Sequence, residues 1–272
     1  MKEIDLINNE IWELWKEHPR EAGFITPKFI KEPTKKTLVF LGLNPSFPKG
    51  GKWQDQEKWN KLKQRIIRLK LLPSGFDDKK GDYRQAFLWK KIEKISDKKQ
   101  KKVIKLFADI HHDARWYYPK WFKRLNCFAK KLGVERKDYG HIDCFLWSDA
   151  KSKSVETRVI ILAGEKIVKA QEDFTKRLLA AHKPRMIVCV YMSAWKHFCK
   201  LYSVCPDKIK EYKLTGKKGD AVLKYADVKI DDVENSVIVI GCPDLPRGYG
   251  KYSIRKEHLE ELFDFANKRY NR

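Results

Sequence analysis

The sequence predicts an α/β fold: a three-layer α/β/α sandwich around a mostly parallel, four-stranded central sheet. Four short apolar runs do not alternate with polar residues, which is typical of strands buried on both faces; they lie at 37–42, 141–147, 186–191 and 236–241. Segments with helical spacing separate these runs. With 272 residues, 42% of them hydrophobic, the chain is long enough and apolar enough to bury such a core.

The helices of this scheme follow from apolar residues that recur every three to four positions. A first helix is expected over 2–17, ended by Pro19, because one helical stripe carries Ile4, Ile7, Ile11, Leu14 and Trp15. The same spacing predicts helices over 164–182, 193–203 and 254–270. Helices of this kind cover the faces of a parallel sheet.

Two insertions are expected within a single domain of residues 1–272. The first, a basic helical insertion over about 50–135, follows from the long separation of the first two strands. It contains an amphipathic segment, 58–72, with six basic residues and no acid. The second insertion, about 205–235, predicts a hairpin that turns at Gly216–Gly219. The glycine spacing of this turn does not match a phosphate-binding P-loop.

Charge and composition limit the partners. Lys and Arg number 59 against 36 acids, a formal charge of +23, which favours a polyanionic partner, most commonly nucleic acid. A generally lysine-rich proteome is the alternative. No apolar run is long enough to cross a membrane and the first residues do not form a signal peptide, so an intracellular, cytoplasmic monomer used at the nucleoid is expected. The six cysteines are scattered without a CxxC pair, and no metal or other cofactor is predicted.

Polar residues follow the predicted strands at the points where a doubly wound sheet forms its sites. Asn44 and Pro45 come after the first strand, and Asp143 and Asp149 lie in or after the second. The fourth strand is followed by a turn rich in Pro and Gly, CPDLPRGYG, at 242–250. We expect these strand ends to converge on one pocket.

The strand-end motifs resemble those of the uracil-DNA glycosylase superfamily, in particular its mismatch-specific and single-strand-selective branches. LVFLGLNPS, at 38–46, is similar to the first motif of that superfamily, and VIVIGCPDLPRGYGKY, at 237–252, resembles the second motif, whose loop wedges into DNA. KPRMIVCVYMSAW, at 183–195, is similar to its third strand, and HIDCFLW, at 141–147, falls where the family carries a base-reading asparagine. The likeness covers the four strands and neither insertion.

The resemblance implies a DNA glycosylase of base excision repair, a hydrolase that cleaves the base–sugar bond of a deaminated or damaged base flipped out of DNA. Asn44 would position the attacking water and Pro45 would hold that geometry. The base would be bound by residues around this motif and by the turn after the fourth strand: Gly42, Leu43, Ser46, Phe47, Trp53, Cys242 and Pro243. DNA, single-stranded or in a mismatched or damaged duplex, would contact the possible wedge residues Leu245, Arg247 and Tyr249 and the basic segment through Lys58, Lys61, Arg65 and Arg68.

Two departures from the family change this expectation. Cys242 stands where a histidine would donate to the departing base, and a thiol is a weak donor. Asp143 stands at the base-reading asparagine, and an ionised carboxylate only accepts hydrogen bonds, so it would repel a uracil carbonyl and favour an exocyclic amine or a ring N–H. An amine-bearing or damaged base therefore fits better than uracil. Asp143 is also a candidate for the catalytic carboxylate. The alternative is a catalytically degenerate, nucleic-acid-binding protein of the same fold; an enzyme acting on free nucleotides is a third.

Each of these features also has a plain structural explanation. Asn44 followed by Pro45 commonly opens a turn, Asp143 in a strand commonly forms a salt bridge, and Cys242 is commonly a packed thiol. His111 and His112 in the segment 109–122 are adjacent, and adjacent side chains on a helix point apart, so no metal site is expected there.

Overall fold

The computed structural model describes residues 3–17, 26–27, 29–31, 35–43, 56–69, 95–117, 119–145, 147–148, 155–246 and 253–271. The chain divides into two compact units, and each takes residues from distant parts of the sequence. The first comprises 1–32, 44–119 and 145–171, and the second comprises 33–43, 120–144 and 172–272. The prediction of a single domain stays a prediction.

The first unit is mainly helical. It contains a two-stranded ladder of β1 (Thr26–Pro27) and β4 (Trp147–Ser148), the first part of α6 (Val155–His182), and the helices α1 (Glu3–Glu17), α2 (Gln56–Arg68) and α4 (Asp97–Tyr117). The stripe predicted for α1 is confirmed where its side chains are described, because Ile4, Ile7, Ile11 and Leu14 are buried. The Asn8 amide joins α1 to the next segment, since Nδ2 donates to the Ile30 carbonyl and Oδ1 accepts from the Ile30 N–H.

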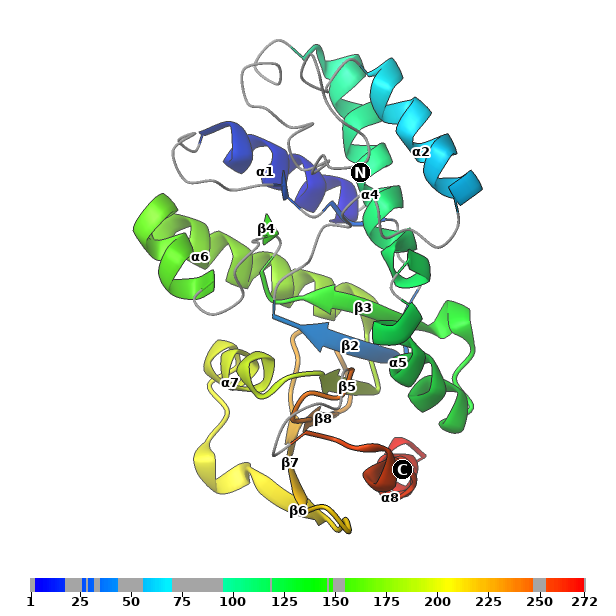
Figure 1. Cartoon of the computed structure of the whole chain (residues 1–272). Coiled ribbons are helices and arrows are strands. Elements are labelled where there is room, and N and C mark those ends of the chain that lie inside the picture. Colours follow the sequence, from blue (N-terminus) through cyan, green and yellow to red (C-terminus); the bar gives the residue numbers. More distant parts are fainter. Residues whose placement is uncertain are drawn as a thin grey trace. The chain divides into compact units, whose positions relative to one another are not determined.

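The second unit is built on a six-stranded mixed sheet (Figure 1). Its strand order is β3-β2-β5-β8-β7-β6, and β3 (Tyr139–Asp143), β2 (Leu38–Gly42), β5 (Met186–Cys189) and β8 (Val237–Gly241) pair in parallel. The last two strands, β7 (Ala221–Val228) and β6 (Lys210–Leu214), are antiparallel. Every residue of β2, β5 and β8 is buried, which explains their unbroken apolar sequence.

Helices pack on both faces of this sheet. On one face, Phe128 of α5 (Pro119–Lys131) lies edge-on to Phe40 of β2 and to Phe263 of α8 (Leu259–Tyr270). On the other face, α7 (Met192–Leu201) places Trp195 against Gly241. α5 lies within the predicted first insertion of about 50–135, and it packs on the sheet.

The α/β class predicted from the sequence is confirmed, but the extent of the sheet is corrected. The predicted hairpin exists as β6–β7, and its turn is closed by a hydrogen bond from the Gly219 N–H to the Gly216 carbonyl. Because β7 pairs with β8, the hairpin extends the central sheet instead of standing apart from it. The sheet therefore has six strands of mixed direction, where four mostly parallel strands were predicted. The predicted three-layer sandwich stays a prediction.

Among the described helices, none has the length and apolar composition needed to cross a membrane.

We expect Gly241→Ala to lower the free energy of unfolding by about 1–3 kcal/mol, because a methyl group in a packed core forces its neighbours to shift. A Cβ at this position would lie 2.7 Å from two ring atoms of Trp195, which is 2% exposed. Urea denaturation measures the effect. The variant Ala226→Ser on β7 is the comparison, since it adds one atom to another small buried side chain. A Gly241→Ala protein as stable as the wild type would contradict the packing of Trp195 against Gly241.

Candidate active site at the carboxyl end of the sheet

The parallel strands have a topological switch point at the carboxyl ends of β2 and β5. After β2 the chain passes to β3 on one side of this switch point, and after β5 it passes to β8 on the other side. Connections that leave neighbouring strand ends in opposite directions open a crevice, and ligands of open α/β sheets bind there. Gly42 ends β2 and Leu43 follows it, and Val190 and Tyr191 follow β5. The sequence therefore predicted a site at the end of the sheet that the topology favours.

Asp143 and Gly42 are register partners at this end of the sheet. The Asp143 side chain is 3% exposed, and one carboxylate oxygen lies over the Gly42 backbone. A Cβ added at Gly42 would stand 2.2 Å from Asp143 Oδ1, closer than real Cβ atoms come. Gly42 is therefore required for this placement of the carboxylate, as is typical of a glycine where another group approaches the backbone closely.

His141 completes the group. It precedes Asp143 by two residues on β3 and so points to the same face of the sheet. Its Nε2 lies 3.8 Å from Asp143 Oδ1 and would lie 3.1 Å from a Cβ at Gly42. Phe122 of α5 meets the imidazole edge-on, with 5.5 Å between ring centroids. His141 was not predicted as a site residue, although period-two alternation back from Asp143 along the strand indicates it.

A half-buried imidazole beside a buried carboxylate can take up, hold and release one proton. Burial also strengthens the interaction between the two groups, because fewer water molecules screen it. We name Gly42, His141 and Asp143 the strand-end triad.

Several predicted site residues lie outside the described residues: Asn44, Pro45, Ser46, Phe47, Trp53, Arg247 and Tyr249. Lys58 lies on α2, but its side chain is outside them too. Among the others, the strand-end triad includes Gly42 and Asp143, and Leu43 is half-buried directly after Gly42.

Cys242 does not suit the role of a proton donor. It is buried, and burial raises the pKa of its thiol far above the usual value. Its N–H donates to the Cys189 carbonyl, which holds it in the backbone network after β8. Burial likewise raises the pKa of Cys144 and Cys189. These thiols belong to the packed interior, as the plain structural explanation for Cys242 proposed.

Alkylation should separate the six cysteines by exposure and pKa. Cys127 and Cys205 are exposed, while burial raises the pKa of the half-buried Cys199 to about 11. At pH 8 roughly one Cys199 thiol in a thousand is ionised, so only Cys127 and Cys205 should react rapidly with iodoacetamide. The Cys199 rate should rise about tenfold per pH unit toward pH 11, measured by peptide mass spectrometry. Rapid labelling of Cys199 at pH 8 would contradict its environment, and urea-unfolded protein gives the reference rates.

The structure contradicts a wedge role for Leu245. Its side chain is 0% exposed, and its N–H donates to the Val190 carbonyl. Arg124 of α5 contributes to holding this turn, because its guanidinium donates 2.5 Å to the Ile254 carbonyl, while the Ile254 N–H donates to Pro243. Pro243 is partly buried and Leu245 fully buried, whereas a side chain that enters DNA has to be exposed.

The predicted basic surface of α2 is partly neutralised. Lys61 pairs with Glu57, and Arg65 pairs with Asp109 of α4, with an Nη2–Oδ2 distance of 3.0 Å. Arg68 is exposed. Arg65 therefore connects α2 to α4, a structural role that was not predicted for it.

The part of the chain that the structure describes holds no group of three or more His, Cys, Asp or Glu side chains placed to bind a metal ion. In comparisons with known proteins, no protein-family model and no curated protein sequence matches the chain. The resemblance to the uracil-DNA glycosylase superfamily stays a prediction.

Proposed function

We propose that the protein is a hydrolase that cleaves the N-glycosidic bond of a modified base in DNA. The observation that carries the proposal is the strand-end triad: a buried carboxylate and an imidazole lie beside a glycine at the switch point of the sheet. In the chain, Asn44 follows Gly42 by two residues, within the motif that resembles the first glycosylase motif.

The triad suits the reaction because hydrolysis of this bond needs a polarised water molecule and a base that leaves with negative charge. Asp143 accepts the proton of the water while the water oxygen bonds to the sugar carbon and the bond to the base breaks, and the departing base then takes up that proton. The His141 imidazole lies beside the carboxylate, with Nε2 3.8 Å from Oδ1. By the resemblance, Asn44 would orient the same water through its side-chain carbonyl. No metal or organic cofactor takes part in this scheme.

The base is expected to carry a hydrogen-bond donor. If Asp143 instead reads the base, its ionised carboxylate repels a carbonyl oxygen and attracts an exocyclic amine or a ring N–H. Uracil offers only N3–H, which lies between two carbonyls, so alkylated, oxidised or otherwise damaged bases that carry an exocyclic amine are better candidates. Bases in single strands or mismatches cost the least to extrude.

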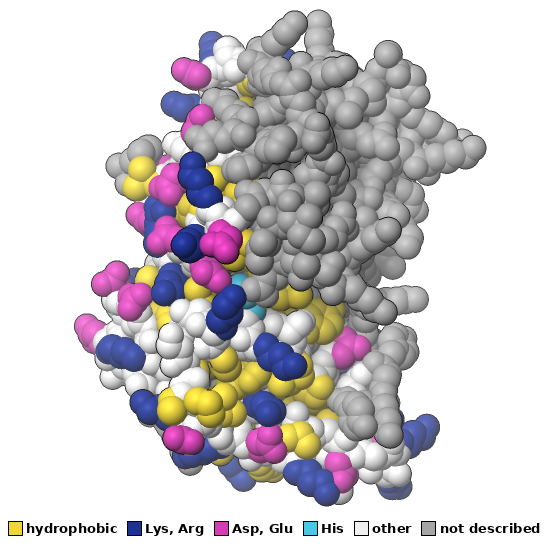
Figure 2. Space-filling model, turned by 90° about the vertical axis from the view of Figure 1, so that its left-hand side faces the viewer, with side chains coloured by type: hydrophobic (Ala, Val, Ile, Leu, Met, Phe, Trp, Pro, Cys, Tyr) yellow, Lys and Arg dark blue, Asp and Glu magenta, His cyan; other side chains and the backbone are white. Residues whose placement is uncertain are grey.

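Charge supports nucleic acid as the partner. The first turns of α4 carry five lysines, Lys98, Lys99, Lys101, Lys102 and Lys105, and none forms an ion pair with a described carboxylate. Lys98 and Lys99 lie in the first turn, where the helix dipole disfavours cations. On the face in Figure 2, by contrast, acidic side chains lie among the basic ones. Uncompensated cations at a helix N-terminus are stabilised by phosphate groups.

We expect the quadruple variant Lys98→Gln, Lys101→Gln, Lys102→Gln and Lys105→Gln to bind single-stranded DNA more weakly, with a smaller salt dependence. The slope of log K against log[salt] should fall by roughly 0.7 for each phosphate group that the variant no longer neutralises. The matched control substitutes four paired lysines, Lys131, Lys137, Lys213 and Lys224, so that net charge changes equally. Fluorescence anisotropy at several salt concentrations measures both, and equal slopes would show that α4 has no special role.

A non-catalytic nucleic-acid-binding protein is the second candidate. The observation that favours it is Cys242, a buried, protonated thiol where the resemblance expects a donor to the leaving base. This candidate keeps the basic surface and uses the triad only to stabilise the strand ends.

A panel of labelled oligonucleotides, each with one deaminated, alkylated or oxidised base, tests the proposal. The protein should convert at least one of them to an abasic, alkali-labile strand, and Asn44→Ala and Asp143→Asn should lower the yield. If every base stays attached while the DNA still binds tightly, the non-catalytic candidate holds. If binding does not depend on salt, both candidates fail and an enzyme of free nucleotides replaces them.

A further inference from the structure

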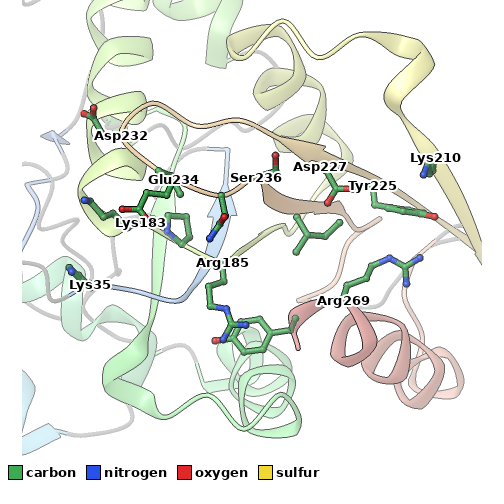
Figure 3. Close-up of a pocket in the computed structure, with 15 residues that line it drawn as sticks. Lys35, Lys183, Arg185, Lys210, Tyr225, Asp227, Asp232, Glu234, Ser236 and Arg269 are labelled. Atoms are coloured by element: carbon green, nitrogen blue, oxygen red, sulfur yellow. The ribbon is translucent and has the colours of Figure 1, made fainter. Parts of the chain in front are cut away.

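A second site is suggested at the opposite end of the sheet. A cavity of about 700 Å³ lies by the amino ends of the parallel strands and within the second unit (Figure 3). Arg185 precedes β5 and Ser236 precedes β8, while Lys210 and Tyr225 come from β6 and β7 and Arg269 from α8. Cavities of this volume hold molecules of nucleotide size. None of the residues predicted for the reaction lines it.

Five cations surround the cavity: Lys35, Lys183, Arg185, Lys210 and Arg269. In Figure 3, Lys35 and Lys183 lie toward one end and Lys210 and Arg269 toward the other, with Arg185 between them. None of the five forms an ion pair with a described carboxylate. Three acids, Asp227, Asp232 and Glu234, also line the space, so the cations outnumber the acids.

The two guanidinium groups are held in place by aromatic rings. The Arg185 guanidinium lies 5.1 Å from the centroid of Tyr270, and that of Arg269 lies 4.5 Å from Tyr225 and 3.7 Å from Phe265. Arg269 donates one N–H to the Phe265 carbonyl, and Arg185 donates no side-chain hydrogen bond within the described residues. A guanidinium stacked on its face keeps its N–H edges available, and those edges fit phosphate oxygens two at a time.

The cations lie near the C-terminal ends of helices, which favour positive charge. α6 ends at His182 and α8 at Tyr270, so Lys183, Arg185 and Arg269 follow or complete these helices. Lys35 adjoins Lys36, whose N–H donates to the His182 carbonyl, and Lys210 follows the 3₁₀ helix Pro206–Lys208 by two residues. Helix ends thus gather the five cations at one cavity, where no described carboxylate forms an ion pair with them.

We propose that this cavity binds a phosphate-bearing ligand of nucleotide size. Arg185 and Arg269 bind phosphate oxygens, and Lys35 and Lys210 neutralise the remaining charge. The acids Asp232 and Glu234, on the β7–β8 connection, accept hydrogen bonds from hydroxyl or amino groups of the same ligand. The phosphate belongs to a free nucleotide or to a nucleic-acid strand, and the proposal does not depend on the glycosidic reaction.

Isothermal titration calorimetry with adenosine, adenosine 5′-monophosphate and a short single-stranded oligonucleotide tests the site. A phosphate-bearing probe should bind and adenosine should not. The double variant Arg185→Gln/Arg269→Gln should raise the Kd about tenfold or more, because it removes charge-assisted hydrogen bonds. Arg136→Gln/Arg177→Gln removes the same charge outside the cavity and should leave the Kd unchanged. Since Arg269 also packs on Phe265, Lys35→Gln/Lys210→Gln provides a second test without that stacking loss.

The probes also distinguish the two sources of phosphate. A free nucleotide is the ligand if adenosine 5′-monophosphate binds and the cavity variants leave oligonucleotide binding unchanged. A strand is the ligand if only the oligonucleotide binds and the cavity variants weaken it. The proposal is overturned if no phosphate probe binds at millimolar concentration, or if both cavity variants bind like wild type.

Discussion

Asp143→Asn is expected to lower the rate of base release by roughly 10²–10⁴-fold, the usual contribution of a positioned acid–base group. Asparagine keeps the size of the side chain over Gly42 but cannot accept the proton of an attacking water. DNA affinity should stay unchanged, because the carboxylate is 3% exposed and contributes no positive charge to the DNA-binding surface. Single-turnover cleavage of the base identified by the oligonucleotide panel measures the rate, and anisotropy measures the affinity.

The pH profile separates a chemical role of Asp143 from a structural one. The wild-type rate should fall on acidification as the carboxylate is protonated, and this acidic limb should disappear in Asp143→Asn. His141→Gln should change the same limb, since its Nε2 lies 3.8 Å from the carboxylate. A slower variant with an unchanged pH profile and a lower melting temperature would indicate that Asp143 only stabilises the strand end.

Gly42→Ala is expected to lower the free energy of unfolding by about 1–3 kcal/mol and to abolish most of the activity. The added methyl group would lie 2.2 Å from Asp143 Oδ1. Both residues lie on adjacent, paired strands, so the backbone cannot move apart without breaking the ladder. The carboxylate must therefore leave its position, and the proton acceptor moves away from the reacting water.

Gly140→Ala is the matched control on the neighbouring strand. The three atoms nearest to a Cβ there all belong to the flexible Lys36 side chain, with Cγ at 3.3 Å, so stability and activity should change little. The double variant Gly42→Ala/Asp143→Ala tests the cause of the loss. Truncating Asp143 removes the clash, so Gly42→Ala should cost less in that background than in wild type. If the two costs simply add, the close approach of Asp143 to Gly42 does not cause the destabilisation.

Much of the candidate site could be predicted because it depends on local patterns. The apolar runs of β2, β5 and β8 show buried strands, and the residue after a strand in such a fold is a natural candidate for a site. Asp143 was found in this way. His141 was missed, although it is two residues away on the same face of β3.

Leu245 is a residue whose environment local sequence patterns do not predict. An apolar residue in a turn rich in Pro and Gly suggests an exposed wedge. The Leu245 N–H nevertheless donates to the carbonyl of Val190, which lies far away in the chain. The hairpin shows the same limit. The strands and turn of the hairpin follow from nearby residues. Its place in the sheet depends on the pairing of β7 with β8, which the sequence of the hairpin does not determine.

The sequence by itself determined the α/β class, the buried strands β2, β5 and β8, the hairpin turn and the excess of basic charge, because apolar spacing, turn residues and composition act over a few neighbouring positions. Only the tertiary structure decided that Gly42 makes room for the Asp143 carboxylate and that stacked arginines from distant segments surround one cavity. The physical reason is that both arrangements depend on contacts between residues far apart in the chain, which form only when the strands pair and the helices pack on them.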